Sequence, residues 1–307
     1  MNDRESSRVT PAADPSGTPE TRREAERVRE NAEWVSVIVK RNDEARRHPD
    51  DILVMAIEEG LEQLCRRGWS LLLSSIGAGL ILGFTAMAVA VVTLATSGIE
   101  LPMVQRILVA LVYPLGFVLC LMSGSELYTE HTATAVYPVL DRQASVPRLV
   151  RLWGIVVAGN LLGAFASAVL LRLADPVVGA ADGYVEIGRH IVAYPTVPLV
   201  FSAILAGWLM ALGAWLILAT PPTVSQFASI YVVTFLIGLG GLHHSIAGAV
   251  EIFSAVLMST EFAAADVARF LVTALLGNLI GGSLFVAVLN YGHIRQSQST
   301  PPEEPPP

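Results

Sequence analysis

Long apolar runs separated by short polar segments dominate the chain from residue 68 onwards. A helix needs about 20 apolar residues to cross the hydrocarbon core of a bilayer, and the charge-free runs predict six crossings. Their expected ranges are 69–97, 106–140, 151–172, 191–218, 226–259 and 269–292. The pattern therefore predicts an all-α membrane protein with six transmembrane helices within residues 68–293.

The second and fifth of these spans are each interrupted by polar residues partway along. In the second span SELYTEH (125–131) separates two apolar stretches, and in the fifth span His243 and His244 do the same. Non-helical backbone is tolerated inside a membrane only where protein buries it or where it lines a water-filled cavity. The two broken spans therefore predict a pore or cavity near the middle of the membrane.

A short motif links the two halves of the chain. GNLLG (159–163) in the third span recurs as GNLIG (277–281) in the sixth. Paired broken segments at corresponding positions are typical of an internal repeat with the transport site at the breaks. Three spans per repeat is an odd number, so the sequence predicts two inverted three-helix repeats.

The segments that flank the spans are polar. Residues 1–49 are rich in Pro and Ser and then in Arg and Glu, which predicts a charged, largely disordered region. Residues 50–67 place Leu53, Ile57 and Leu64 on one helical face, which predicts an amphipathic helix along the membrane interface. Residues 294–307 form a Pro-rich tail.

Composition and charge support a membrane protein and give its orientation. Charged residues make up only 15% of the chain, against about 25% in soluble domains. The loop 141–151 carries three arginines, whereas the loops on the opposite side hold six carboxylates: Glu100, Asp175, Asp182, Glu186, Glu261 and Asp266. The positive-inside rule therefore predicts a multi-pass protein of the cell membrane with both termini cytoplasmic. Nothing indicates a nucleic-acid partner.

Six ionisable residues lie in or beside the two breaks. They are Glu126, Glu130, His131, His243, His244 and Glu251. Ionisable groups at this depth are costly, so they usually face a cavity or one another. The alternative is that some of them only tie the broken backbone to its neighbours, and we assign Glu126, Glu130 and His243 to such loop support.

Five motifs in order resemble one known family, the formate/nitrite transporters. They are EEGLEQL, PLGFVLCLMSGSELYT, ILAGWLMALGAW, LHHSIAG and LLGNLIGG, and the resemblance covers about residues 50–293. It implies an aquaporin-like fold, with a second half-helix after the first break. It also implies a homopentamer in the lipid bilayer with one anion pore in each protomer.

The resemblance also implies roles for individual residues. His244 takes the place of the central pore histidine, with Thr129 facing it and with Ser245 and Asn278 beside the pore. Tyr113, Phe117 and Ile237 fall where the family builds its apolar constrictions.

Other positions depart from the family pattern. Gly207 and Gly248 stand where the family has asparagines, and His243 stands in place of a glutamate. The vestibule lysine expected before the fourth span is absent, because Lys40 is the only lysine in the chain. We expect Arg189 or His190 to replace it, and the physiological anion stays open.

The sequence therefore predicts a channel or transporter for small monovalent anions of weak acids, with protons as the second partner and no cofactor. His244, oriented by Thr129 or Asn278, is expected to lend or stabilise the proton, while His243 points toward Glu126 or Glu130. One alternative is a non-conducting or regulatory relative. Another is an intramembrane metalloenzyme, which adjacent histidines about 100° apart on a helix fit poorly.

Overall fold

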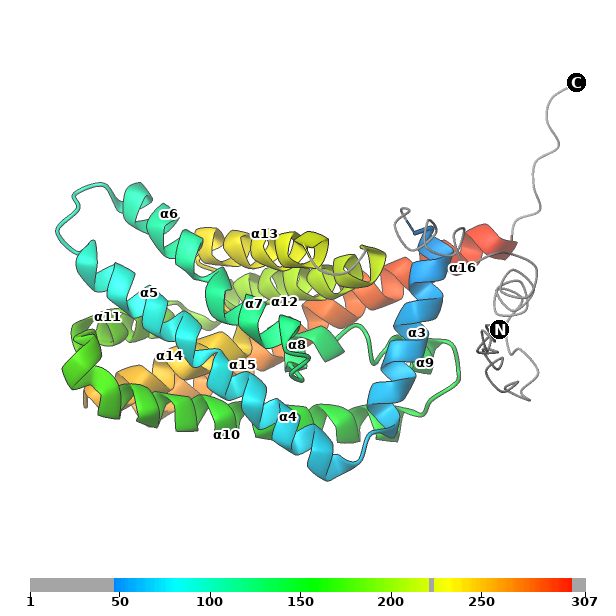
Figure 1. Cartoon of the computed structure of the whole chain (residues 1–307), viewed down its shortest axis with the longest axis horizontal. Helices are drawn as coiled ribbons and strands as arrows, with labels where there is room; N and C mark the ends of the chain where they lie inside the picture. Colours follow the sequence, from blue (N-terminus) through cyan, green and yellow to red (C-terminus); the bar gives the residue numbers. More distant parts are fainter. Residues whose placement is uncertain (1–46, 221–223, 300–307) are drawn as a thin grey trace, which may run out of the picture. The chain divides into compact units, whose positions relative to one another are not determined.

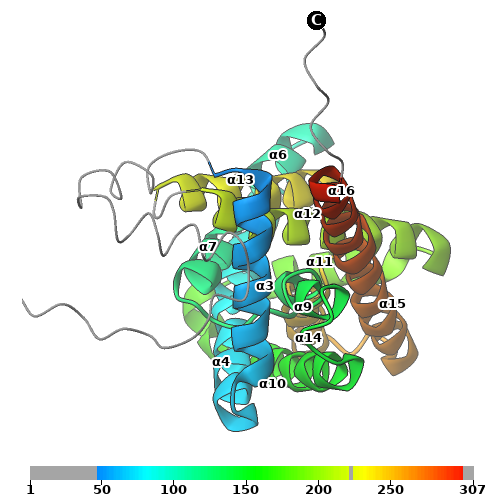
Figure 2. The ribbon, with the colours of Figure 1, turned by 90° about the vertical axis from the view of Figure 1, so that its right-hand side faces the viewer.

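The computed structural model describes residues 47–220 and 224–299. The expectations for residues 1–46 and for the end of the tail, from residue 300, lie outside the described residues. Helix α3 (Pro49–Cys65) begins with the His48 side chain accepting a hydrogen bond from the N–H of Asp50. It crosses one end of the helical bundle (Figure 2). It packs against α9 (Tyr137–Leu140), α10 (Val146–Val178), α12 (Thr196–Ala219) and α16 (Leu289–Ser299).

The first half of the bundle contains the candidate crossings Gly68–Ala95, Pro102–Met122 and Val146–Val178, and Figure 1 shows the helices that form them. Its helices are α4 (Gly68–Ile81), α5 (Gly83–Ala95), α6 (Pro102–Val112), α7 (Pro114–Met122), α8 (Tyr128–His131), α9 (Tyr137–Leu140) and α10 (Val146–Val178). Helices α4 and α5 together form an apolar crossing of 28 residues. Pro114 offers no N–H at the junction of α6 and α7, which divides the second crossing near Tyr113.

The second half follows the same order. Its helices are α11 (Ala181–Ala193), α12 (Thr196–Ala219), α13 (Val224–Gly240), α14 (Ser245–Met258), α15 (Ala264–Gly282), a π-helical segment (Ser283–Val288) and α16 (Leu289–Ser299). Within the described residues, five helical stretches are long and apolar enough to cross a membrane, with α4–α5 and α6–α7 each counted as one. The pair α13–α14, bent by 53° at its break, makes the sixth crossing. The predicted all-α fold class is confirmed.

Two expected segments differ in detail. The half-helix expected after the first break is only two helical turns, α8 and α9, separated by residues 132–136. Thr132 and Thr134 are β-branched, and their hydroxyls bond the carbonyls of Thr129 and Glu130, which competes with a continuous helix. The fourth crossing begins at Thr196 rather than at 191, because Tyr194 and Pro195 end α11.

The two halves pack through equivalent helix pairs. The pairings α4–α10 and α12–α15 are the two most extensive in the described structure. A Cβ atom on Gly79 would press on the backbone of Asn160, and one on Gly207 would press on the backbone of Asn278. Small residues let the helices approach this closely. The close contact with the backbone of Asn278 leaves no room for a side chain at residue 207. This packing explains why glycine stands there in place of the asparagine of the family pattern.

Candidate functional site

The first break is held by Asn160, which projects from α10. Its Nδ2 donates to the carbonyl oxygens of Ser75, at 2.8 Å, and Glu126, at 2.9 Å. Its Oδ1 accepts a hydrogen bond from the N–H of Tyr128 at 2.9 Å. The N–H of Glu126 donates to Ser74 Oγ at 3.2 Å, so side chains of the neighbouring crossings satisfy the backbone that the break leaves unpaired.

The second break is held in the same way by Asn278, which projects from α15. Its Nδ2 donates to the carbonyl oxygens of Ala203, at 2.7 Å, and His243, at 3.1 Å. Its Oδ1 accepts from the N–H of Ser245 at 2.8 Å, and the N–H of His243 donates to Ser202 Oγ at 3.2 Å. The asparagines of the two GNL motifs are therefore equivalent clamps, and Asn278 orients backbone rather than the imidazole of His244.

The two breaks meet at His244 and Thr129. Thr129 Oγ1 lies 2.9 Å from His244 Nε2, and both residues are buried. His244 also caps α14, where its Nδ1 accepts hydrogen bonds from the N–H groups of Ile246 at 3.2 Å and Ala247 at 3.1 Å. An accepting Nδ1 carries no proton, so this cap assigns the imidazole proton to Nε2, which donates to Thr129.

Aromatic rings cover this pair on one side. The ring of Phe117 meets the His244 imidazole edge to face, with centroids 4.9 Å apart, and Tyr113 packs on Phe117 at 5.2 Å. Phe117 and Ile237 have no exposed surface. Of the three residues expected at the constriction, Phe117 packs on His244, Tyr113 packs on Phe117, and Ile237 is buried. That they form a constriction stays a prediction.

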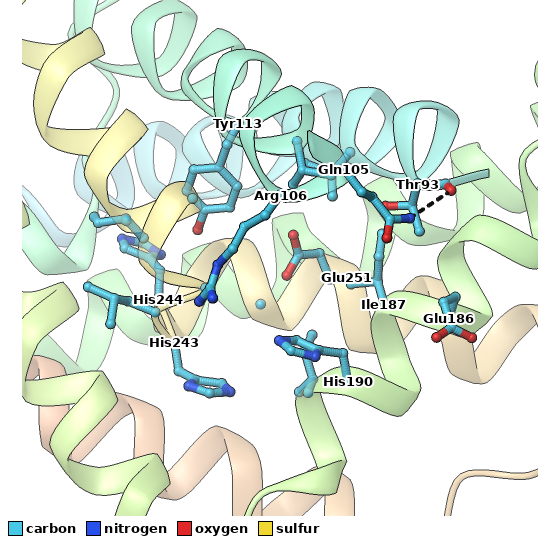
Figure 3. A pocket seen from close by; sticks show the side chains of 18 of the residues that line it. Thr93, Gln105, Arg106, Tyr113, Glu186, Ile187, His190, His243, His244 and Glu251 are labelled. Atoms are coloured by element: carbon cyan, nitrogen blue, oxygen red, sulfur yellow. Dashed lines mark hydrogen bonds between the residues drawn. The ribbon is translucent and has the colours of Figure 1, made fainter. Parts of the chain in front are cut away.

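A cavity of about 340 Å³ lies beside this cluster, and Tyr113, Ile237 and His244 are among the residues that line it (Figure 3). Its charged or titratable lining residues are Arg106, Tyr113, Glu186, His190, Tyr194, His243, His244 and Glu251. Arg106 extends across the cavity from α6 and donates to the carbonyl oxygen of Gly240, at the end of α13, at 2.6 Å.

Arg106 and His190, rather than Arg189, lie at this cavity. Both flank Gly241, whose φ of +58° marks the turn into the break. Burial and the nearby Arg106 guanidinium lower the pKa of His190, so Arg106 is the permanent cation of the pair. Arg106 was not among the residues expected at the vestibule, although one signal in the sequence marks it: it is the only Lys or Arg between Arg67 and Arg142.

Arg189 does not line the cavity, so the expectation that it could serve as the vestibule cation is wrong. Its guanidinium lies on the exposed face of α11 and forms ion pairs with Glu261 at 2.8 Å and Glu186 at 3.2 Å. Arg269 holds the end of α11 by donating to the carbonyl oxygens of Val192 and Tyr194, which fixes the helix face that presents His190.

The expectation that His243 points toward the opposite break is also wrong. Its Nδ1 lies 2.7 Å from Ser202 Oγ, and its ring packs edge to face on Tyr194 with centroids 5.3 Å apart. Ser202 bonds both the backbone and the ring of His243, which turns the side chain into the cavity. His243 Nε2 is buried with no hydrogen-bond partner among the described residues.

The carboxylate of Glu126 instead joins a cluster at the α3 end of the bundle. It pairs with Arg66, which follows α3, and with His131 of α8. His131 Nδ1 donates to Gln63 Oε1 at 2.7 Å. In the described structure, the Glu126 carboxylate thus connects the first break to Arg66 at the end of α3. Glu130 forms hydrogen bonds only through its backbone there.

The described residues offer no set of metal ligands for the metalloenzyme alternative. Across residues 47–220 and 224–299, no three His, Cys, Asp or Glu side chains are placed so that they could hold a metal ion.

Fold and site together define a multi-pass membrane protein of two inverted repeats, whose broken spans meet at a histidine–threonine pair. The chain belongs to the formate/nitrite transporter family, because the sequence profile described as formate/nitrite transporter matches residues 50–292. The predicted family is thus confirmed. The inner membrane protein YfdC of Escherichia coli (strain K12) is 31% identical over 246 residues, which cover 79% of this chain and 77% of that protein.

Solved structures share the fold. A structure titled FNT family ion channel superposes with a TM-score of 0.71 at 19% identity, over 82% of this chain and all of that one. A pentameric formate channel with formate bound superposes with a TM-score of 0.63 at 20% identity, over 75% of this chain and 98% of that one. The predicted aquaporin-like architecture of six crossings is confirmed.

Proposed function

We propose that this protein conducts small monovalent anions of weak acids, of the formate or nitrite kind, across the membrane together with protons. Membership of the family supports this function. The observation that carries it is the contact between Thr129 Oγ1 and His244 Nε2, directly behind the rings of Tyr113 and Phe117. A polar pair at an otherwise apolar constriction is the arrangement that a small polar substrate needs there.

Proton linkage follows from the cost of the constriction. An anion that leaves water for the apolar surroundings of Phe117 and Ile237 loses hydration that a single hydrogen bond does not replace. The neutral acid form avoids most of this cost. Because Thr129 accepts the Nε2 proton of His244, its own O–H is available to donate to a passing substrate. Ser245 Oγ is buried there without a hydrogen-bond partner in the described structure, so it is also available.

This geometry changes the proposed role of His244. A proton lent by His244 would require the imidazolium form, in which Nδ1 also carries a proton. That form would release the N–H groups of Ile246 and Ala247, and the loss of such a cap costs about 0.5–2 kcal/mol. We therefore assign His244 the role of a neutral donor that orients the Thr129 hydroxyl.

The cavity serves as the vestibule for the anion. Arg106 replaces the lysine that the family resemblance led us to expect, and His190 adds a second donor beside it. A cation in a partly enclosed cavity raises the local concentration of anions.

Assembly and orientation complete the proposal. The protein forms a homopentamer with one pathway in each protomer, in line with the solved pentameric formate channel. Exposed apolar side chains such as Leu162, Phe165 and Leu276 supply surface for lipid and for neighbouring protomers. The termini, including residues 1–49 and 294–307, are cytoplasmic, and α3 lies along that interface.

A flux assay in liposomes tests the function. Purified protein would be reconstituted, and the uptake of formate, nitrite, hydrosulfide, acetate and lactate would be followed at pH 5.5 and at pH 7.5, so that the proton concentration differs about a hundredfold. We expect uptake of the smaller anions above that of protein-free liposomes, and faster uptake at the lower pH. Uptake equal to that of empty liposomes for every anion would favour the non-conducting alternative.

A further inference from the structure

Glu251 is the one acidic side chain of α14, and it lines the vestibule beside the constriction. Figure 3 shows its carboxylate pointing into the space between Tyr113 and His190. The residue is only 8% exposed, and within residues 47–220 and 224–299 it makes no side-chain hydrogen bond and no ion pair. A buried carboxylate of this kind needs a counterion, a hydrogen-bond donor or a proton.

The groups around the cavity do not supply a direct counterion. From α6 and its end come Arg106 and Tyr113, from α11 Glu186 and His190, and from the second break His243 and His244. Helices α5 and α15 contribute only uncharged lining residues, among them Thr93 and Phe270, and α10 contributes none. The Arg106 guanidinium bonds the carbonyl oxygen of Gly240 and forms no ion pair with Glu251.

An anion that enters this cavity makes an ionised Glu251 still less favourable. The vestibule holds about 340 Å³, so a small anion and the Glu251 carboxylate lie close together there. Two like charges in such a site favour the binding of a proton by one of them. A protonated Glu251 also offers an O–H donor to the anion, in the way that a carboxylic acid binds a carboxylate.

We infer that Glu251 is the proton-binding group of the permeation path, so that the vestibule takes up each monovalent anion together with one proton held on the Glu251 carboxyl. This inference rests on the proposed function. The proton comes from water on the vestibule side, passes from Glu251 Oε to the anion as the anion enters the constriction, and leaves with it as the neutral acid. Glu251 is then a carboxylate again and accepts the next proton from the same water.

His244 and Glu251 thus divide two roles that were both expected of His244. His244, with Nδ1 engaged in the cap of α14, acts as a fixed hydrogen-bond donor. Glu251 has no structural bond to break when it titrates, so it can change protonation in every transport cycle.

The decisive variant is Glu251→Gln, which keeps the volume and an N–H donor but cannot carry the proton. Formate uptake into liposomes would be measured from pH 5 to 8 with wild type, Glu251→Gln, Glu251→Asp and Glu261→Gln. Glu261 is an exposed carboxylate between α14 and α15 that does not line the cavity, which makes it a matched control. Proton entry would be followed in parallel with a pH-sensitive dye trapped inside.

For wild type and Glu261→Gln we expect uptake to fall by up to about tenfold per pH unit on the alkaline side, as for a single titrating group, with one proton per formate. Glu251→Gln should retain uptake, vary by less than about twofold over the range and lose its proton signal. Glu251→Asp should keep the pH dependence with a displaced midpoint. That variant decides the question if Glu251→Gln does not assemble, as judged by gel filtration.

The outcomes that overturn the two proposals differ. An unchanged pH profile in Glu251→Gln, or in Glu251→Asp if only that variant assembles, with normal wild-type uptake would overturn the role of Glu251 and leave the proposed function intact. Absence of formate and nitrite uptake by wild type at every pH would overturn the proposed function, and the role of Glu251 with it.

Discussion

Asn160 and Asn278 make the same three hydrogen bonds in the two halves of the protein. Each amide donates to one carbonyl oxygen in a neighbouring crossing and to one in a break, and each side-chain oxygen accepts the N–H two residues after the break carbonyl. The inverted repeat is thus preserved at the level of single atoms. These clamps fix the backbone on both sides of the contact between Thr129 and His244.

Removal of either clamp should destabilise the protein. Asn160→Ala and Asn278→Ala each leave one N–H and two carbonyl groups without their partner in a buried site. An unsatisfied buried group costs about 1–3 kcal/mol, so we expect a clear fall in the melting temperature and loss of oligomer in mild detergent. Thermal unfolding followed by gel filtration would measure both effects.

The matched control for this prediction is Gln143→Ala. Gln143 is an exposed amide that bonds only the side chain of Asp141. Its loss should change the melting temperature little. If the asparagine variants had the same melting temperature as Gln143→Ala, the hydrogen bonds of Asn160 and Asn278 would not be what stabilises the two breaks.

The hydroxyl of Thr129 should matter more for flux than for stability. Thr129→Val keeps the shape but removes the acceptor of the His244 Nε2 proton and the donor for substrate. We expect the uptake of formate or nitrite to fall at least about tenfold, which corresponds to about 1.4 kcal/mol. Thr129→Ser retains the hydroxyl and should keep most of the activity. Equal rates for the Val and Ser variants would rule out a hydroxyl contact with the substrate.

The sequence was sufficient to predict the crossings and the breaks, and the family resemblance placed Thr129 opposite His244. Apolar runs follow directly from the thickness of the bilayer, and polar interruptions within them have few structural explanations. The GNL repeat also marked Asn160 and Asn278. Their bonds to backbone could not be predicted, because those carbonyl groups come from distant crossings.

The direction of single side chains was less predictable. His243 and His244 are adjacent in sequence, and only the contacts of Ser202 with one and of Thr129 with the other decide which residue faces which space. Arg106 and Glu251 lie far apart in the chain and meet at the vestibule only after folding. Arg189 looked equivalent to His190, but Glu186 and Glu261 hold it on the exposed face.

Stability should also depend on acid pH through Asp141, which lies between α9 and α10. Burial alone would raise its pKa, but hydrogen bonds from Gln143, Tyr291 and Arg295 outweigh burial and lower the pKa from its ordinary 3.8. A carboxyl whose folded pKa is lowered contributes stability above its unfolded pKa and loses it as the pH falls through the folded value. The contact between Asp141 and α16 should therefore weaken below about pH 4.

Asp141→Asn tests this contact. We expect a lower melting temperature than wild type at pH 7, and a difference that shrinks as the pH falls below about 4 toward the lowered pKa of the folded Asp141. The exposed carboxylate of Asp182 offers a control in Asp182→Asn. A difference between Asp141→Asn and wild type that stayed constant from pH 7 to 3 would mean that the charge of Asp141 contributes nothing.

The choice between Arg106 and Arg189 as the vestibule cation can be tested with two matched substitutions. Arg106→Gln removes the positive charge but keeps an N–H donor for the carbonyl oxygen of Gly240, so the local fold should survive. At an effective dielectric constant of about 20, a unit charge a few ångströms from an anion contributes a few kcal/mol. We therefore expect the half-saturating concentration of formate or nitrite to rise at least about tenfold.

Arg189→Gln, which breaks only exposed ion pairs with Glu186 and Glu261, should change this half-saturating concentration by less than about twofold, because such pairs contribute little. The reverse ranking of the two variants would place the functional cation on the outer face of α11 and would return Arg189 to the role that the sequence first gave it.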